Sequence, residues 1–345
     1  MQRLKLTAVC FLIILVGGCT SGNETKNEKM QPVALDNINA DPLPSWNEGN
    51  TKKSIVNYVT NVTKEGGPDF IPVPDRIATF DNDGTLWSEQ PLYFQFFYIL
   101  DEVKAMAPQN PEWKSKQPFK AVLENNMDEL MRQGERALLQ ITAVSHAGMT
   151  TEHFDSTVGQ WIDTAKHPTK HKLYKELVFQ PMLELIKYLQ ANQFKVFIVS
   201  GGGIDFMRAW AEETYGIPKD QIIGSSLKAR YDYNNGNPVI TKLPELNYYD
   251  DKEGKPVAIA NYIGRKPVFA GGNSDGDLQM LQWTASNRLK NFELYVHHTD
   301  STREWAYDST SHIGTFKQGW IEARAKGWTL VDMKSDWKLI YPFEK

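Results

Sequence analysis

The sequence is almost free of cysteine. Its 345 residues include only Cys10 and Cys19, and both lie near the N-terminus. A scaffold held by disulfides needs more cysteines spread along the chain, and a zinc site built from cysteines is excluded for the same reason. A chain of this length can instead bury a substantial hydrophobic core, as one large domain or as two smaller ones.

An excess of basic charge is also missing. The chain has 38 lysines and arginines against 42 aspartates and glutamates, which gives a formal net charge of −4. Nucleic-acid backbones are bound by clustered lysine and arginine, so the acidic balance argues against a nucleic-acid partner. With 41% hydrophobic and 23% charged residues, the composition is that of an ordinary globular protein.

The hydrophobic run at the N-terminus is too short to span a membrane comfortably. Arg3 and Lys5 precede an apolar stretch over residues 6–16, and a Gly-Gly-Cys sequence ends at Cys19. A spanning helix needs about 20 apolar residues, whereas this layout is typical of a secretory signal. Residues 16–19 resemble the lipobox of bacterial lipoproteins, which implies a signal peptide over residues 1–18 and acylation of Cys19. An ordinary secretory signal with a chance cysteine is the alternative.

The segment over residues 19–50 is rich in Asn, Asp, Glu, Lys, Pro and Ser and has few large apolar side chains. Such a segment cannot offset the entropy cost of its own ordering, so we expect a flexible tether. The two N-terminal segments together predict a protein that is secreted across the inner membrane. We expect a lipid anchor to hold it in the bacterial cell envelope, facing the periplasm or the extracytoplasmic surface.

The rest of the chain alternates between two hydrophobic periods. Short apolar runs predict strands over 76–80, 194–199, 267–270 and 292–298. Apolar residues at helical spacing predict helices over 52–64, 93–107, 121–131, 154–165, 181–189, 204–215 and 255–263. Residues 229–242 are typical of a hairpin that turns on Asn235-Gly236. Alternating strands and helices predict an α/β fold with a parallel sheet, and ligands at the carboxyl ends of the strands.

Polar clusters follow three of the predicted strands. They are Asp-Asn-Asp-Gly-Thr over 81–85, Ser200 with the glycines 201–203, and Gly-Asn-Ser-Asp-Gly-Asp over 272–277. Lys255 begins the helix before the last cluster. Because the ends of parallel strands meet in one crevice, these groups are expected to share a site.

The residue types in these clusters suit phosphoryl transfer. One carboxylate can act as the nucleophile, and a second carboxylate two residues later can protonate the leaving group and then activate water. Mg²⁺ prefers the hard oxygen ligands that the acidic loops supply. Ser200, the amides that follow it and Lys255 can hold the phosphoryl oxygens.

Four motifs resemble those of the haloacid dehalogenase (HAD) superfamily, within its phosphoserine-phosphatase-like branch. They are Phe-Asp-Asn-Asp-Gly-Thr-Leu over 80–86, Val-Ser-Gly-Gly over 199–202, Lys-Pro-Val-Ala-Ile over 255–259 and the Gly-Asn-Ser-Asp-Gly-Asp cluster over 272–277. They fall in the order of that superfamily, and the resemblance covers about residues 70 to 285. It implies a Rossmann-like parallel-sheet core over 51–87 and 181–345, with a helical cap inserted over 88–180.

The resemblance also implies roles for individual residues. Asp81 is the implied nucleophile and Asp83 the implied acid and base, with Ser200 and Lys255 holding the phosphate. The implied phosphate-binding set is Gly84, Thr85, Ser200, Gly201 and Lys255. The implied ligands of Mg²⁺ are Asp81, Asp83 through its main-chain oxygen, Asn273 and Asp277.

Two positions depart from the pattern of that superfamily. Its fourth motif often begins Gly-Asp, and that aspartate is a ligand of the metal, whereas this chain has Asn273. Either Asn273 or Asp277 could therefore be the principal metal ligand of the fourth motif. The phosphoserine enzymes also carry a glutamate nine residues after the nucleophile. This chain has Gln90 there, beside Glu89, so specificity for phosphoserine is not supported.

Three further residues are tentative candidates for the site. Trp87 follows the first motif and is a candidate for shaping the substrate pocket. The pair His297-His298 ends a predicted strand, and because adjacent strand residues face opposite ways, at most one histidine points toward the site. His298 and Arg303 are the candidates there, while a helix cap by Asp300 with surface ion pairs is the structural alternative.

The sequence therefore predicts a Mg²⁺-dependent phosphatase that hydrolyses small phosphomonoesters through an aspartyl-phosphate intermediate. Its partners would be a small phosphorylated substrate and, through the lipid anchor, a membrane. A phosphotransferase with the same intermediate is one alternative. A non-catalytic lipoprotein that binds a ligand or partner on the same scaffold is another, and Asn273 favours it.

Overall fold

The computed structural model describes residues 41–344. The predicted signal peptide, the acylation site Cys19 and most of the predicted tether lie outside the described residues. Within residues 41–344, none of the helices is both long enough and apolar enough to cross a membrane.

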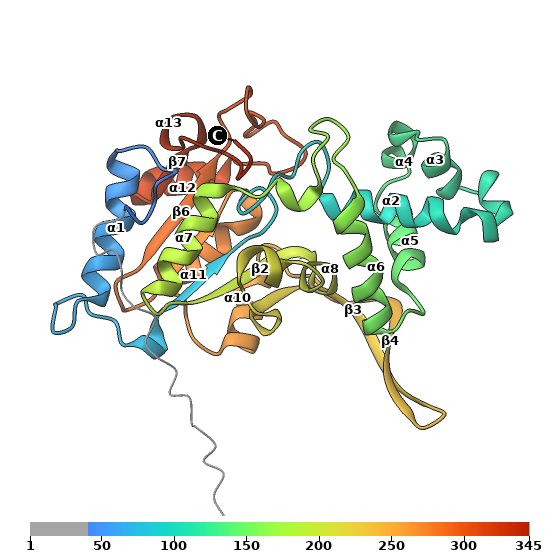
Figure 1. Ribbon diagram of the computed structural model, residues 1–345, viewed down its shortest axis with the longest axis horizontal. Coiled ribbons are helices and arrows are strands. Elements are labelled where there is room, and N and C mark those ends of the chain that lie inside the picture. The colour runs from blue at the N-terminus through green and yellow to red at the C-terminus, as the bar shows by residue number, and fades with distance from the viewer. Residues whose placement is uncertain (1–40, 345) are drawn as a thin grey trace, which may run out of the picture. The chain divides into compact units, whose positions relative to one another are not determined.

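A seven-stranded sheet forms the centre of the described part (Figure 1). Its strands are β1 (Ile77–Phe80), β2 (Lys195–Gly203), β3 (Ile222–Asn234), β4 (Asn237–Tyr248), β5 (Phe269–Gly272), β6 (Phe292–His297) and β7 (Thr329–Asp332). The order across the sheet is β4-β3-β2-β1-β5-β6-β7, and every neighbouring pair is parallel except β3 and β4. The predicted α/β class, with a Rossmann-like parallel sheet, is confirmed.

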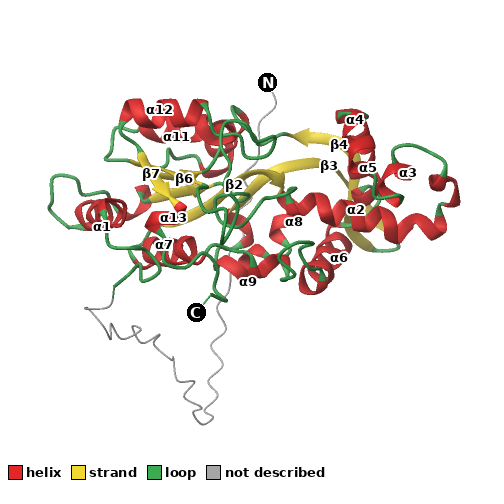
Figure 2. Cartoon of the chain, turned by 90° about the horizontal axis from the view of Figure 1, so that it is seen from above, coloured by secondary structure: helices red, strands yellow, loops and turns green. Residues whose placement is uncertain are grey.

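Helices cover both faces of this sheet (Figure 2). On one face lie α1 (Asn50–Thr63) and α7 (Gln180–Ala191), and on the other lie α10 (Gly254–Ala258), α11 (Leu278–Ala285) and α12 (Gln318–Lys326). The short α13 (Met333–Asp336) follows β7. The central strands are buried on both faces, as all four residues of β1 are, which explains their unbroken apolar sequence.

The helical cap lies between β1 and β2 in the chain. Its helices are α2 (Phe94–Met106), α3 (Phe119–Leu123), α4 (Met127–Arg132), α5 (Glu135–His146) and α6 (Thr151–Thr164). Between residues 88 and 180 the structure contains no strand of the sheet, as the sequence pattern predicts. The predicted helix over 121–131 is wrong in detail, because residues 124–126 separate α3 from α4.

The predicted helix over 204–215 is also wrong in detail. It is two short helices, α8 (Ile204–Arg208) and α9 (Ala211–Tyr215), separated at Trp210. The backbone of Trp210 has φ −140°, outside the helical range, and its indole ring stacks on the ring of Trp87 with centroids 4.2 Å apart. A tertiary contact therefore interrupts a segment whose apolar spacing predicts one continuous helix.

The folded body begins earlier than the predicted end of the tether at residue 50. Leu43 and Trp46 are fully buried. The Trp46 indole nitrogen donates to the carbonyl oxygen of Pro181 at 2.9 Å, and its ring meets the ring of Trp337 edge-on. Two isolated apolar side chains in a polar stretch give no periodic signal, which is why the sequence pattern missed them.

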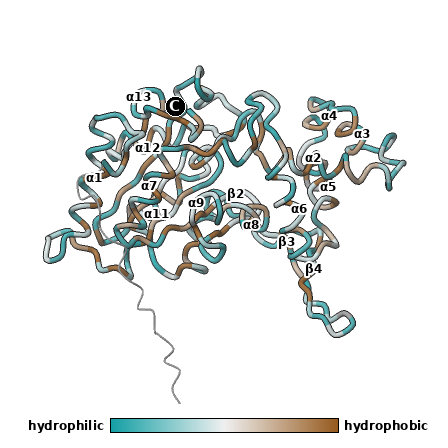
Figure 3. Tube along the Cα trace, in the orientation of Figure 1, coloured by the Kyte–Doolittle hydropathy of each residue, from teal (hydrophilic) through white to brown (hydrophobic). Residues whose placement is uncertain are grey.

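The hairpin of β3 and β4 projects beyond the rest of the sheet and turns at Asn235-Gly236, as predicted (Figure 1). Its outer end is hydrophilic (Figure 3). Nearer the sheet, the loop between α5 and α6 pairs with β4. The Gly148 amide donates to the Lys242 carbonyl oxygen, and the Lys242 amide donates to the Met149 carbonyl oxygen, each at 2.9 Å. Main-chain hydrogen bonds thus join the cap to the hairpin.

Candidate active site

The turn over residues 81–87, called the catalytic loop below, follows β1 directly. The Asp81 amide donates to the carbonyl oxygen of Gly271 in β5 at 3.0 Å, which places Asp81 at the carboxyl edge of the sheet. Gly84 has φ +71°, and a Cβ there would lie 2.0 Å from the side-chain nitrogen of Asn273. This position therefore requires glycine both for its conformation and for the close approach of the fourth motif.

Lys255 joins the ends of three strands. Its buried ammonium group donates to Asp81 Oδ1 and Asp277 Oδ1, each at 2.7 Å, and to the carbonyl oxygen of Val199 at 2.8 Å. Burial works against the charge of Lys255, but the carboxylates of Asp277 and Asp81 raise the pKa of the ammonium group. One buried cation thus offsets part of the charge of two buried carboxylates.

Asp81 keeps one oxygen for other partners. Burial, together with the nearby charge of Asp277, raises its pKa well above the usual value, while Lys255 acts in the opposite direction. Lys255 occupies Oδ1, which leaves Oδ2 for a substrate or ligand. This is the arrangement that a carboxylate nucleophile requires.

Both oxygens of Asp277 have donors from the protein. Oδ1 accepts from Lys255, and Oδ2 accepts from the main-chain amides of Asn273 at 2.9 Å and Ser274 at 3.0 Å. Asp277 therefore holds the fourth motif in place against Lys255.

Trp87 holds Asp83. The Trp87 indole nitrogen donates to Asp83 Oδ1 at 2.8 Å, and the Trp87 ring is fully buried against Trp210 and Phe94. Burial raises the pKa of Asp83 to about 6, although the bond from Trp87 acts in the opposite direction. Asp81 and Asp83 line a cavity that is described below, and Trp87 does not line it, so Trp87 is connected to the site through Asp83 rather than through the cavity wall.

The second motif lies at the end of β2. Ser200 is buried, and its hydroxyl oxygen accepts from the Gly202 amide at 3.1 Å. The Gly203 amide donates to the side-chain oxygen of Gln95, which belongs to cap helix α2, at 2.7 Å. Ser200 and Gly201 line the cavity together with Asp81. The structure thus brings the second motif to Asp81, and the phosphate-holding role of Ser200 stays a prediction.

His298 reaches the back of the catalytic loop. Its Nε2 lies 2.7 Å from the carbonyl oxygen of Gly84, to which it must donate, and its Nδ1 lies 3.0 Å from Glu304 Oε2. Burial lowers the pKa of His298, but Glu304 outweighs it, so the pKa is raised overall. His297 faces the other way and packs on Trp320. One histidine of the pair therefore supports the loop, and neither lines the cavity.

Arg303 lies outside the cavity. It donates to Asp300 Oδ2 at 2.6 Å and to the carbonyl oxygens of Trp337 and Lys338. Asp300 also accepts from the main-chain amide of Arg303 at 2.9 Å. The predicted alternative is right about the ion pair between Asp300 and Arg303 but wrong about a helix cap, because Asp300 accepts main-chain bonds within a turn and no helix begins there in the described part of the chain.

Glu89 is a site residue that motif reasoning missed. It is 2% exposed, and its Oε1 accepts from the Asn273 side-chain nitrogen at 2.8 Å and from the Tyr307 hydroxyl at 2.7 Å. Asn273 Oδ1 in turn accepts from the Thr85 hydroxyl at 3.2 Å. The only signal in the sequence is the position of Glu89 next to Gln90.

A cavity of about 420 Å³, called the catalytic cavity below, opens at these groups. Its core wall includes Asp81, Asp83, Ser200, Lys255 and Asp277. Its cap wall comes from α2 and α5 and the segment just before α2, and consists of Tyr93, Gln95, Phe96, Ile99, Leu138 and Thr142. The cap thus forms one wall of a small chamber over Asp81.

The donor set determines which kind of metal site is available. Within residues 41–344, no group of three or more His, Cys, Asp or Glu side chains is arranged to hold a metal ion. A site here would therefore combine Asp81 with neutral oxygens, namely the main-chain oxygen of Asp83 and the amide oxygen of Asn273. Hard oxygens of this kind fit Mg²⁺, which is bound through one or two carboxylates and keeps several waters.

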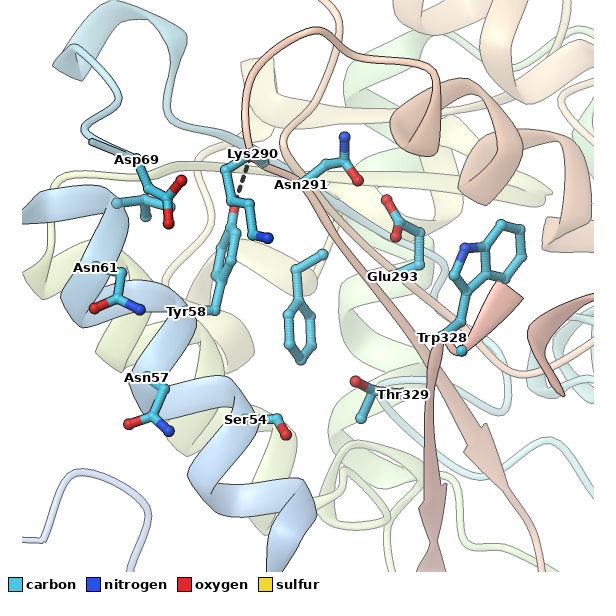
Figure 4. Close-up of a pocket in the computed structure, with 13 residues that line it drawn as sticks. Ser54, Asn57, Tyr58, Asn61, Asp69, Lys290, Asn291, Glu293, Trp328 and Thr329 are labelled. Carbon is cyan, nitrogen blue, oxygen red and sulfur yellow. Dashed lines mark hydrogen bonds between the residues drawn. The ribbon is translucent and has the colours of Figure 1, made fainter. Parts of the chain in front are cut away.

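A second cavity of about 390 Å³, called the far cavity below, lies between α1 and the beginnings of β6 and β7 (Figure 4). Ser54, Asn57 and Tyr58 of α1 line one side of it, and Glu293 and Trp328 line another. None of the predicted site residues lines this cavity.

Comparison with protein families gives one match. The model described as haloacid dehalogenase-like hydrolase matches residues 78–282, which is more than half of the chain and includes all four motifs. The search of curated proteins found no match.

Several solved structures are similar at low identity. A protein of unknown function from Anaerococcus prevotii is 15% identical, with a TM-score of 0.46 over 76% of this chain and 89% of that one. A probable phosphoserine phosphatase from Vibrio cholerae is 14% identical, with a TM-score of 0.37, and the match covers 76% of this chain and 62% of that one. A phosphoserine phosphohydrolase-like protein from Francisella tularensis is 15% identical, with a TM-score of 0.35, and the match covers 64% of this chain and 87% of that one. Likenesses this distant support no inference about activity.

Proposed function

Because this chain belongs to the haloacid dehalogenase-like hydrolases, we propose that it is a Mg²⁺-dependent phosphatase that acts on small phosphomonoesters. One observation carries the proposal. Asp81 lies at the floor of the catalytic cavity with one oxygen bound to Lys255, and Asp83 lies two residues away in the same cavity. The pair provides the nucleophile and the proton donor that the reaction needs.

The reaction proceeds in two steps. In the first, the free oxygen of Asp81 forms a bond to phosphorus, the ester P–O bond breaks, and Asp83 gives its proton to the leaving oxygen. In the second, Asp83 takes a proton from water, the water oxygen attacks phosphorus, and the bond to Asp81 breaks. The pKa of about 6 at Asp83 suits a group that must both give and take a proton near neutral pH.

Mg²⁺ would be held by Asp81, the main-chain oxygen of Asp83 and Asn273. When bound, it offsets the negative charge of the phosphoryl group and of Asp81. Asp277 is a weaker candidate, because Lys255 and two amides already occupy its oxygens. Enzymes of this family generally use Mg²⁺, which supports the proposal.

The size and chemistry of the cavity favour a small substrate. The chamber of about 420 Å³ is bounded on the cap side by apolar groups such as Phe96, Ile99 and Leu138. Lys255 is its only lysine or arginine among the described residues, and it already pairs with two carboxylates. A leaving group that itself carries several negative charges therefore fits poorly.

The test uses purified protein that lacks residues 1–19, since residues 41–345 form a compact unit of their own. We expect Mg²⁺-dependent release of phosphate from a generic aryl phosphate, and we expect Asp81→Asn to lower kcat by at least about 10⁴-fold. Asp69→Asn, a matched change in the far cavity, is the control and should leave kcat unchanged. Absence of turnover on a broad panel of phosphoesters would contradict the proposal.

Two other functions fit particular observations. Asn273 in place of an acidic ligand favours a non-catalytic protein that binds a ligand or partner on this scaffold, and the phosphoester panel separates it from an enzyme. The same aspartyl-phosphate could also pass its phosphoryl group to an acceptor other than water. Product analysis with added alcohols separates this transfer from hydrolysis.

We also propose attachment to the cell envelope through acylated Cys19, which lies outside the described residues. Cys19→Ser should block lipid attachment and shift the protein from the membrane fraction to the soluble fraction. Unchanged processing and soluble partitioning, both in this variant and in cells treated with globomycin, would contradict the anchor.

A further inference from the structure

The proposed Mg²⁺ ligands carry little negative charge. Asp81 contributes one carboxylate, and Lys255 already offsets part of that charge at 2.7 Å. Asp83 would contribute a neutral main-chain oxygen, and Asn273 a neutral amide oxygen. Because metal affinity depends on the number of charged ligands, such a set is weak for a divalent cation unless another carboxylate takes part.

A further carboxylate, that of Glu89, lies beside Asn273. Glu89 lines the catalytic cavity together with Asp81 and Asp83. Its Oε1 accepts both of the hydrogen bonds that this carboxylate receives, from Asn273 at 2.8 Å and from Tyr307 at 2.7 Å. Oε2 has no hydrogen bond among the described residues and is not fully buried, so Oε2 is the oxygen that faces the cavity.

Two loops leave room for this carboxylate. Gly84 and Gly314 both have positive φ, and a Cβ at these positions would lie 2.5 Å and 2.0 Å from Glu89 Oε1. Any other residue at either position would displace the carboxylate. The backbone on both sides is therefore shaped to hold Glu89 where it is.

The bond from Asn273 also fixes the orientation of that amide. Because its nitrogen donates to Glu89, its oxygen points the other way, toward the catalytic loop, where it accepts from Thr85 at 3.2 Å. Glu89 therefore sets the direction in which the amide oxygen of the fourth motif points.

We propose that Glu89 supplies the negative charge that Asn273 lacks, with its Oε2 binding Mg²⁺ directly or through one of the metal's waters. This inference rests on the proposed function. A cavity carboxylate can alternatively bind a cationic group of the substrate. The contacts favour the metal, because Glu89 bonds to Asn273 of the fourth motif and lies against Gly84 of the catalytic loop. Among the described residues, it has no hydrogen bond to a cap side chain.

The test measures metal binding without substrate, by calorimetry with Mg²⁺ and by electron paramagnetic resonance with Mn²⁺. Glu89→Gln keeps the shape and the acceptor for Asn273 and Tyr307 but removes the charge. We expect it to weaken binding of both ions by about 10- to 100-fold. The matched control is Asp251→Asn, a carboxylate that lines the same cavity beside Gly201 and Gly276 and should change affinity less than about twofold.

A double variant, Glu89→Gln with Asn273→Asp, returns the lost charge to the neighbouring position. We expect it to bind the ions more tightly than Glu89→Gln alone. If Glu89→Gln does not fold, Glu89→Asp, which withdraws the carboxylate by one methylene, should bind more weakly than the wild type.

Two results would overturn this inference and leave the phosphatase proposal standing. One is that folded Glu89→Gln binds the ions as tightly as the wild type, and the other is that the double variant binds them no more tightly than Glu89→Gln. Failure of the wild-type protein to bind either ion would overturn both.

Discussion

Two cavities of similar size lie at opposite edges of the same sheet, one where strands end and the other where strands begin. The catalytic cavity, of about 420 Å³, opens where β1 and β2 end, and the far cavity, of about 390 Å³, opens where β6 and β7 begin. Both contain buried carboxylates. They differ in what those carboxylates contact.

In the catalytic cavity, buried carboxylates share one cation. Lys255 donates to Asp81 and Asp277. In the far cavity, Glu293 is 7% exposed, its Oε1 is buried without a hydrogen-bond partner, and burial raises its pKa to about 7 (Figure 4). Volume alone therefore does not distinguish a reaction site. The convergence of strand-end loops on a common cation does, because it brings carboxylates from separate motifs together beside one compensating charge.

Removing the shared cation should have the largest effect on stability. Lys255→Met leaves Asp81 and Asp277 buried beside each other without compensation, and we expect a loss of about 3–5 kcal/mol in the free energy of unfolding at pH 7. Urea denaturation measures this change.

The control for Lys255→Met is Lys219→Met, which breaks an exposed pair with Asp155 and should cost less than about 1 kcal/mol. If both variants lost the same amount, Asp81 and Asp277 would not depend on Lys255, and the contrast between the two cavities would fail.

Glu293→Gln should have a smaller effect, of the opposite sign. The folded pKa of Glu293, about 7, lies above its ordinary value of 4.5. Between these values the folded protein holds a proton that the unfolded chain has lost, so stability falls as pH rises through this window and the full loss is present above pH 7. We expect Glu293→Gln to stabilise the protein by about 1–3 kcal/mol at pH 8.

The same variant should differ little from the wild type at pH 4, where Glu293 is mostly protonated in both states, and the rate of phosphate release that we propose should be unchanged. Thermal or urea unfolding at the two pH values checks the first expectation. A variant that is less stable at pH 8, or that loses activity, would show that Glu293 has a partner or a role in the reaction.

The sequence was sufficient for most of the sheet and for the meeting of the motifs, although it gave no prediction for the strand β7 or for the first part of β3. Buried strands carry unbroken apolar runs, and polar residues directly after parallel strands must lie at one edge, so Asp81, Lys255 and Asp277 could be placed together without coordinates. Their roles in catalysis stay predictions.

The supporting network could not be predicted in this way. Glu89 contacts Tyr307, and His298 contacts Gly84, across more than 200 residues of chain. Glu89 and Tyr307 lie in irregular segments, where no period relates one residue to another. The break at Trp210 has the same origin, because a contact between distant residues overrides local spacing there.

The bonds between the cap and β4 have a consequence for association between molecules. β4 is an edge strand, and an open edge offers unpaired main-chain groups to which another chain can add. The loop before α6 makes hydrogen bonds to both main-chain groups of Lys242. Pro238 and Pro244 of β4 have no amide hydrogen that another strand could bind. The cap that forms a wall of the catalytic cavity thus also shields the middle of this edge strand from edge-to-edge aggregation.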